Sequence, residues 1–384
     1  MSKLASRLQN MAERSTRFGK EFTAGINRQE VARLFDQEAR GAYQVLTEDA
    51  PTKEEEADDL SRFMRQAKGF FVGFALKLSP GRRLLFAFCL LCPLLGLFDL
   101  DASIGPYRVF VDFSPFWFLT SIAGLTLLLA LELVDRLRVR DELDVARELQ
   151  SELLPRSEPD LPGYRIAHSY RTANEIGGDY YDFLPLPDGR IVLTVGDASG
   201  HGISAGLVMA IANATLKTAL DVDPRPQAVL SQLNRTLYRT GGRRAFMTLF
   251  YSVLDPATGD LEFACAGHPF PMLRRGDGTI EELGTGALPL GIHKNSTFAT
   301  GETTLEHGDL LVLYSDGIPE AAGGPHGDTF GFDRLMGLLV HPESPKIIHD
   351  RILRAVRQHL GDQTLDDDLT LVVLDRAPAL QLSQ

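Results

Sequence analysis

The most informative stretch of this sequence is VGDASGHGISAGLVMA, residues 195–210. The residues just before it, 191–195, are apolar and β-branched, as expected for a buried strand. Asp197 follows that strand, glycines then permit a tight turn, and residues 204–220 have the composition of a helix. The pattern therefore predicts a strand that carries a carboxylate to a turn, where binding groups often lie.

Short apolar runs separated by Gly, Pro and Asp continue over residues 161–376. Strands are predicted at 191–195, 246–254, 261–266, 310–314 and 369–374, and helices at 204–220, 227–239 and 346–360. Most of these strands are joined by turns, such as DPATG at 255–259, rather than by crossover helices. We therefore expect an antiparallel, layered domain of the α+β class.

Aspartates recur at the ends of these predicted strands. They are Asp179 in IGGDYYD, Asp197, Asp316 after the strand 310–314, and Asp366, Asp367 and Asp368 before the strand 369–374. Buried carboxylates need compensation, and no Lys or Arg is adjacent to any of them. A single Asp of this kind is more often a turn residue, but the set favours a site for Mg²⁺ or Mn²⁺, which prefer oxygen ligands.

Other reactive residue types give weaker signals. His201 and His268, the latter in AGHPFP, could be acids or ligands, although a structural hydrogen bond is the commoner role. Ser199 and Ser315 lack a base at a spacing typical of a catalytic triad. With three cysteines there is no disulfide framework, and the pair CLLC at 89–92 lies in an apolar run, where packing or lipid contact is expected.

Two apolar runs precede the domain, LLFAFCLLCPLLGLF at 84–98 and FWFLTSIAGLTLLLALELV at 116–134. The second is long enough to cross a bilayer, whereas the first is short and contains Pro93. Arginines flank the pair on one side, at positions 82, 83, 136, 138 and 140, which predicts a hairpin with both ends in the cytoplasm. No cleavable signal peptide is expected, because residues 1–30 are polar. The alternative is a buried hydrophobic hairpin in a soluble domain.

After the second run, apolar residues recur every three or four positions, at Val139, Leu143, Ala146, Leu149 and Leu153. This spacing predicts an amphipathic connecting helix that ends at Pro155 and could form a coiled coil in a homodimer. The expected order is a charged, helical N-terminal region (1–80), a transmembrane hairpin (81–135), the connecting helix (136–155), the catalytic domain (156–377) and a tail (378–384).

The net charge of −12, from 39 Lys and Arg against 51 Asp and Glu, argues against a nucleic-acid partner. Bound cations can nevertheless make an acidic protein attractive to a phosphate at one place.

Eight segments resemble the PPM family of metal-dependent protein serine/threonine phosphatases (protein phosphatase 2C-like), in its bacterial branch of the sporulation stage II phosphatase and sigma-factor regulators. They are ELQSELLP (148–155), ANEIGGDYYDF (173–183), VGDASGHGISAGLVMA (195–210), FMTLFYSVLD (246–255), AGHPFP (266–271), LPLGI (288–292), LYSDGIPEA (313–321) and DDDLTLVVL (366–374). The resemblance implies an antiparallel β-sandwich flanked by helices, in α-β-β-α layers.

The resemblance also implies a catalytic site with two Mn²⁺ or Mg²⁺ ions bridged by Asp197. Asp179 and the carbonyl of Ala198 would hold one ion and Asp316 and Asp367 the other, with Asp368 as a substitute for Asp367. The phosphate-binding arginine of the eukaryotic branch has no evident counterpart.

The expected function is that of a membrane-anchored phosphatase with its catalytic domain in the bacterial cytoplasm, at the inner membrane. Its substrate would be a phosphorylated regulatory protein of the anti-anti-sigma-factor type. The rivals are a catalytically weak scaffold of the same fold and a hydrolase for small phosphoesters.

Overall fold

The computed structural model describes residues 71–97, 100–104, 107–155, 157–240, 245–323, 327–361 and 363–377. Most of the predicted N-terminal region (1–80) and the predicted tail (378–384) lie outside these residues. Contacts between residues divide the chain into two units, 1–137 and 138–384, which are described separately.

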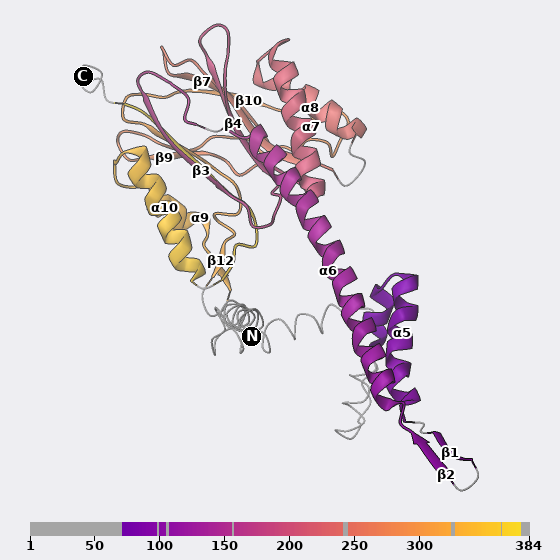
Figure 1. The fold of residues 1–384 in the computed structure, drawn as a ribbon. Helices are drawn as coiled ribbons and strands as arrows, with labels where there is room; N and C mark the ends of the chain where they lie inside the picture. The colour runs from indigo at the N-terminus through magenta and orange to yellow at the C-terminus, as the bar shows by residue number, and fades with distance from the viewer. Residues whose placement is uncertain are drawn as a thin grey trace, which may run out of the picture. The chain divides into compact units, whose positions relative to one another are not determined.

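In the first unit, α5 (Pro80–Leu95) packs against the beginning of α6 (Ser114–Leu153), with the hairpin β1 (Leu100–Ile104) and β2 (Tyr107–Val111) between them in sequence (Figure 1). Ser121 Oγ donates a hydrogen bond to the Cys89 carbonyl at 2.7 Å, and Gly124 leaves no room for a Cβ beside the Cys89 sulfur. Small residues thus let the two helices approach closely. Cys89 and Cys92 are buried and free.

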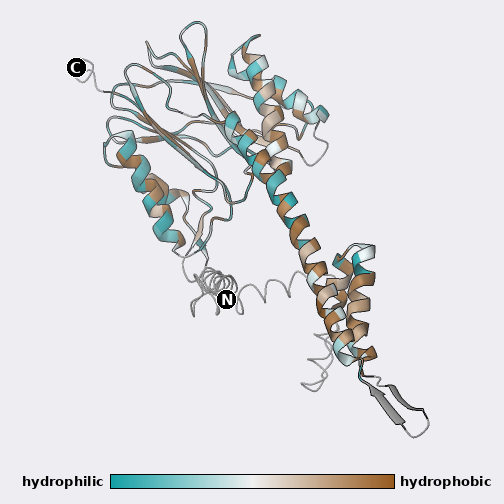
Figure 2. Ribbon diagram, viewed as in Figure 1, coloured by the Kyte–Doolittle hydropathy of each residue, from teal (hydrophilic) through white to brown (hydrophobic). Residues whose placement is uncertain are grey.

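One continuous helix, α6, covers both the second apolar run and the predicted connecting helix. Two described helices, α6 and α7 (Ile203–Leu220), are long and apolar enough to cross a membrane. In the most apolar 18-residue segment of α6, 11% is buried, whereas 39% of the corresponding segment of α7 is buried. α7 is a core helix of the second unit. Two such helices are weak evidence for membrane association. In Figure 2 the ribbon of α5 and of the early part of α6 is mostly coloured as hydrophobic.

The second unit contains two five-stranded antiparallel sheets. The first has the order β10-β7-β6-β5-β4, formed by Thr300–Thr304, Asp260–Ala266, Met247–Leu254, Ile191–Ala198 and Asp179–Pro185. The second has the order β3-β14-β11-β8-β9, formed by Tyr164–Arg171, Leu369–Arg376, Leu310–Tyr314, Met272–Arg274 and Ile280–Glu282. A short pair, β12 (Ala322–Gly323) and β13 (Asp328–Thr329), lies outside these sheets.

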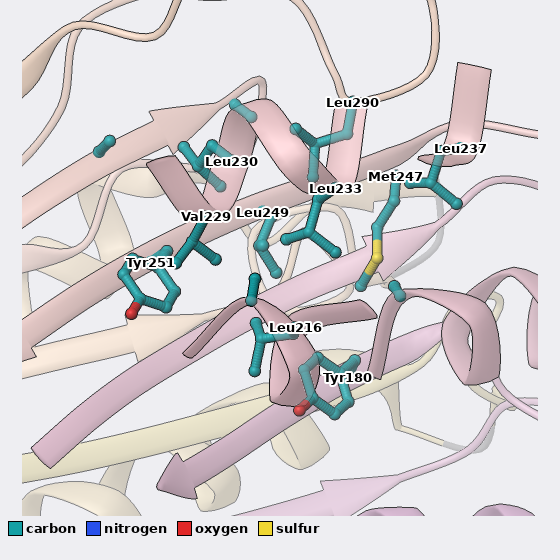
Figure 3. Packing of buried hydrophobic residues seen from close by; sticks show 14 of the residues in the cluster. Tyr180, Leu216, Val229, Leu230, Leu233, Leu237, Met247, Leu249, Tyr251 and Leu290 are labelled. Carbon is teal, nitrogen blue, oxygen red and sulfur yellow. The ribbon is translucent and has the colours of Figure 1, made fainter. Parts of the chain in front are cut away.

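Helices cover the outer face of each sheet (Figure 1). The first sheet is covered by α7 and α8 (Pro226–Thr240), and the second by α9 (Phe332–Gly337) and α10 (Pro345–Leu360). One buried cluster lies between α7, α8 and the first sheet, and Figure 3 shows Leu216, Leu233, Met247 and Tyr251 within it. A second cluster fills the space between the sheets and a third lies under α10. Each large apolar side chain buried in this way contributes about 1.5–3 kcal/mol. The α+β prediction, with antiparallel sheets and helices, is confirmed.

Candidate metal-dependent active site

Two of the predicted aspartates face each other across neighbouring strands of the first sheet. Asp179 begins β4, Asp197 lies near the end of β5, and the antiparallel register pairs them directly. Asp179 is 1% exposed, whereas Asp197 is partly exposed. A Cβ added to Gly178 would lie 2.7 Å from both Asp197 Oδ1 and the Ala198 carbonyl oxygen. Glycine therefore keeps open a small space lined by two oxygen ligands.

The second sheet supplies the other predicted residues. β11 and β14 are antiparallel neighbours, so Asp316, which follows β11, lies beside the segment that leads into β14 and contains Asp367. The backbone NH of Ser315 donates to the Thr370 carbonyl at 3.1 Å, and Ser315 Oγ donates to the Asp368 carbonyl at 3.2 Å. These bonds fix the two aspartate-bearing segments against each other.

The two sheets meet at this point. Thr370 in β14 donates its hydroxyl to Asp179 Oδ2 at 2.6 Å, and so joins the second sheet to the first. Asp316 and Asp367 also lie close enough to Asp197 to raise its pKa. The structure thus brings together Asp179, Asp197, Asp316 and Asp367, which are far apart in the sequence.

The electrostatics of this cluster are unfavourable without a cation. Burial, followed by the charge of Asp197, raises the pKa of Asp179 well above its usual value. Burial and repulsion from Asp316 and Asp367 raise the pKa of Asp197 to about 8. Burial and the charge of Asp367 raise the pKa of Asp316 to about 6, and burial raises the pKa of Asp367. A nearby divalent cation would favour the ionised forms and reverse these shifts.

Asp368 is already engaged by the backbone. Its Oδ1 accepts from the Ala173 NH at 2.8 Å and its Oδ2 from the Gly178 NH at 2.5 Å. The buried Asp368 therefore holds the loop that leads to Asp179. Asp367 is exposed as a whole residue although its carboxylate is partly desolvated, and its Oδ1 accepts from the Asp368 NH at 2.8 Å.

Sequence reasoning missed Gln150, near the end of α6. The Gln150 amide nitrogen donates to the Gly177 carbonyl at 2.6 Å, and its oxygen accepts from the Gly177 NH at 3.2 Å. The side chain is 6% exposed and is also near Met209 of α7. Gln150 lies in ELQSELLP, on a predicted amphipathic helix. That pattern does not predict its hydrogen bonds to Gly177.

The serines and histidines singled out in the sequence have other surroundings than the aspartate cluster. Ser199 Oγ accepts from the Phe246 NH at 2.9 Å, and Ser315 is buried with its hydroxyl bonded to the backbone. His201 is exposed in the loop before α7. His268 is buried and bonded to Thr248 and Tyr314. The hydroxyls of both serines therefore take part in hydrogen bonds with the backbone.

The residues fit hard divalent cations by the chemistry of their donors. The donors are carboxylate and carbonyl oxygens, and buried Asp316 Oδ1 has no hydrogen-bond partner among the described residues. Within that part of the chain, no three His, Cys, Asp or Glu side chains are gathered round one point as a metal would hold them. The four carboxylates nevertheless lie close enough to raise one another's pKa values. A bound cation would supply the positive charge that compensates their repulsion.

Comparison with solved structures identifies the class of fold. The structure is similar to the SiaA-PP2C domain of Pseudomonas aeruginosa, with a TM-score of 0.56 and 22% identity, over 63% of this chain and 98% of that one. The fold is therefore PP2C-like.

The family follows from the sequence. Residues 187–377 match the family model of stage II sporulation protein E (SpoIIE). These residues therefore form a SpoIIE-type domain of the PP2C (PPM) serine/threonine phosphatases, as the resemblance predicts.

Two curated relatives are similar over 62% of this chain, each with 27% identity: Protein IcfG of Synechocystis sp. and the phosphoserine phosphatase RsbU of Bacillus subtilis. The aligned region spans 42% of the first relative and 71% of the second.

Proposed function

We propose that this protein hydrolyses phosphoserine or phosphothreonine on a regulatory protein, with two Mn²⁺ or Mg²⁺ ions held by Asp179, Asp197, Asp316 and Asp367. The observation that carries this proposal is the meeting of these carboxylates, from both sheets, at one cluster where burial and mutual repulsion raise their pKa values. The likeness to a phosphoserine phosphatase supports the reaction class.

The division of ligands follows the register. Asp197 is paired with Asp179 and also lies near Asp316 and Asp367 of the second sheet. This position supports our assignment of Asp197 as the ligand that would bridge two ions. Asp179 and the Ala198 carbonyl would hold one ion, and Asp316 and Asp367 the other. Asp368 would act as a loop anchor, because both its oxygens already accept backbone NH groups.

When bound, two divalent ions would supply Lewis acidity that activates a water and offsets charge on the transferring phosphoryl group. The chain's own residues prepare this site. Thr370 orients the Asp179 carboxylate by donating its hydroxyl, and Asp368 fixes the backbone beside it. Hydrolysis by activated water needs no serine nucleophile, which is consistent with the backbone bonds of Ser199 and Ser315.

Asp197→Ala and Asp316→Ala test the reaction directly. Each variant should lower Mn²⁺-dependent phosphate release from a phosphoserine protein by roughly a hundredfold or more, because charge stabilisation at the reacting phosphate is lost. Asp188→Ala is the matched control, since Asp188 is an exposed aspartate paired with Arg190 in a turn. Undiminished release in both site variants would contradict the proposal, and release from small phosphoesters alone would favour the rival hydrolase.

We also propose that α5 and residues 114–137 of α6 form a membrane hairpin with both ends in the cytoplasm. Large apolar side chains of this unit are exposed, such as Leu84 at 75%, Leu119 at 67% and Leu129 at 69%, which is unfavourable in water. α5 has 16 residues, so at 1.5 Å per residue it extends about 24 Å, less than the bilayer core of about 30 Å. Multi-pass insertion therefore depends on α6 and on residues that flank α5.

Cell fractionation tests the hairpin. The full chain should sediment with membranes and require detergent for release, whereas a chain that starts at Arg140 should remain in the soluble fraction. A full chain that stays soluble without detergent would show that the hairpin is a buried element of a soluble protein.

The end of α6 is the segment through which we expect regulation. Val145 and Leu149 are 58% and 60% exposed, which suits a partner helix in a homodimer. Gln150 on the same helix bonds to Gly177, two residues before Asp179. By the family resemblance, the substrate would be a phosphorylated protein of the anti-anti-sigma-factor type.

A further inference from the structure

His268 is a buried histidine whose two ring nitrogens both have partners. It follows β7, is 3% exposed, and has Nδ1 2.9 Å from Thr248 Oγ1 and Nε2 3.1 Å from the Tyr314 carbonyl oxygen. A carbonyl oxygen only accepts, so Nε2 carries the proton and Nδ1 accepts the hydroxyl of Thr248. Burial lowers the pKa of His268 to about 4, so the ring is neutral near pH 7.

The partners of His268 belong to different sheets. Thr248 lies in β6 directly opposite Asp197 of β5, in the first sheet. Tyr314 is the last residue of β11, in the second sheet, and precedes Asp316 by two positions. One side chain therefore connects both sheets at the end where the two aspartates emerge.

We propose that His268 is a positioning residue that sets the spacing between Asp197 and Asp316. The inference rests on the proposed two-ion site, because the spacing matters through the ions that both aspartates would help to hold. Cation coordination requires ligand oxygens at defined distances, and groups that orient ligands typically change metal affinity by about 10–100-fold. Loss of the bridge should weaken metal binding more than it lowers turnover at saturating metal.

Calorimetric titration of the full chain in detergent with Mn²⁺ tests this role. His268→Asn and Thr248→Val should each weaken Mn²⁺ binding by about tenfold or more. Thr248→Ser, which keeps the hydroxyl, should bind almost as the original chain does. The double variant should be no weaker than His268→Asn alone, since both changes remove the same contact.

His349→Asn is the matched control. His349 is also buried, at 7% exposure, and its Nε2 lies 2.9 Å from the hydroxyl of Ser169, which links α10 to β3. This variant should lose stability in urea unfolding without a change in Mn²⁺ affinity. Equal Mn²⁺ affinity in the His268, Thr248 and His349 variants would overturn the inference.

If His268→Asn does not fold, Thr248→Val decides the question, because it removes one hydroxyl with little change of shape. Unchanged binding in Asp197→Ala would instead count against the two-ion site itself, so the two failures are distinguishable.

Discussion

At the residue scale, the site is a set of carboxylates that the fold holds in an unfavourable state. A raised pKa means that the protonated form of Asp197 or Asp316 suits the fold better than the charged form. Their contribution to stability is fully present below about pH 4 and is lost as the pH rises toward about 6 for Asp316 and about 8 for Asp197. Divalent cations would replace the protons, and so cation affinity should increase across the same range.

At the scale of elements, the site depends on strand register and on contacts between segments far apart in the sequence. β4 and β5 pair Asp179 with Asp197, while β11 and β14 place Asp316 beside Asp367. Thr370 joins these two pairs, and Gln150 joins the loop before β4 to the helix α6. The position of α6 therefore bears directly on the backbone that leads to Asp179.

Gln150→Ala tests the contribution of that helix. The change removes two hydrogen bonds from a buried glycine, which costs about 1–3 kcal/mol where partners stay unsatisfied, and it should loosen the loop before Asp179. We expect lower phosphatase activity that is partly restored by excess Mn²⁺, measured as phosphate release over a Mn²⁺ series.

Ser151→Ala is the control for this helix, because Ser151 is exposed and its hydroxyl donates to the Glu148 carbonyl of the same helix. Equal Mn²⁺ dependence of phosphate release in the two variants would show that Gln150 contributes only packing and does not position the loop before Asp179.

At the scale of the whole molecule, the chain combines a unit with an exposed apolar surface and a unit that carries the phosphatase fold. The continuous helix α6 contributes residues to both units. The net charge of −12 includes the carboxylates of the cluster, so bound cations would change the local charge most where a phosphate must approach.

Much of this organisation could be predicted from the sequence, because local patterns report on strands and motifs. The strand 310–314 matches β11, and the helix 204–220 matches α7 within one residue. The sequence does not predict β3, because YRIAHSYR mixes polar and apolar residues without a clear period. The segment DYYDFLP, which forms β4, predicts a motif around Asp179 but no strand, because it contains a second charged position and ends in proline.

The candidate site was predictable as a set of residues but not as a set of contacts. Asp367 and Asp368 are adjacent and chemically identical, so the sequence could not tell that Asp368 binds the Gly178 backbone. The partners of Gln150 and His268 lie 27 and 46 positions away, respectively, at Gly177 and Tyr314, where no local pattern reports on them.

The most direct measurement of the two-ion claim is a calorimetric titration of the chelator-treated full chain with Mn²⁺, at pH 8 and at pH 6. We predict two Mn²⁺ ions per chain, tighter binding at pH 8 than at pH 6, and loss of both ions in Asp197→Ala. Fewer than two ions per chain at saturation, or binding that Asp197→Ala leaves unchanged, would contradict it.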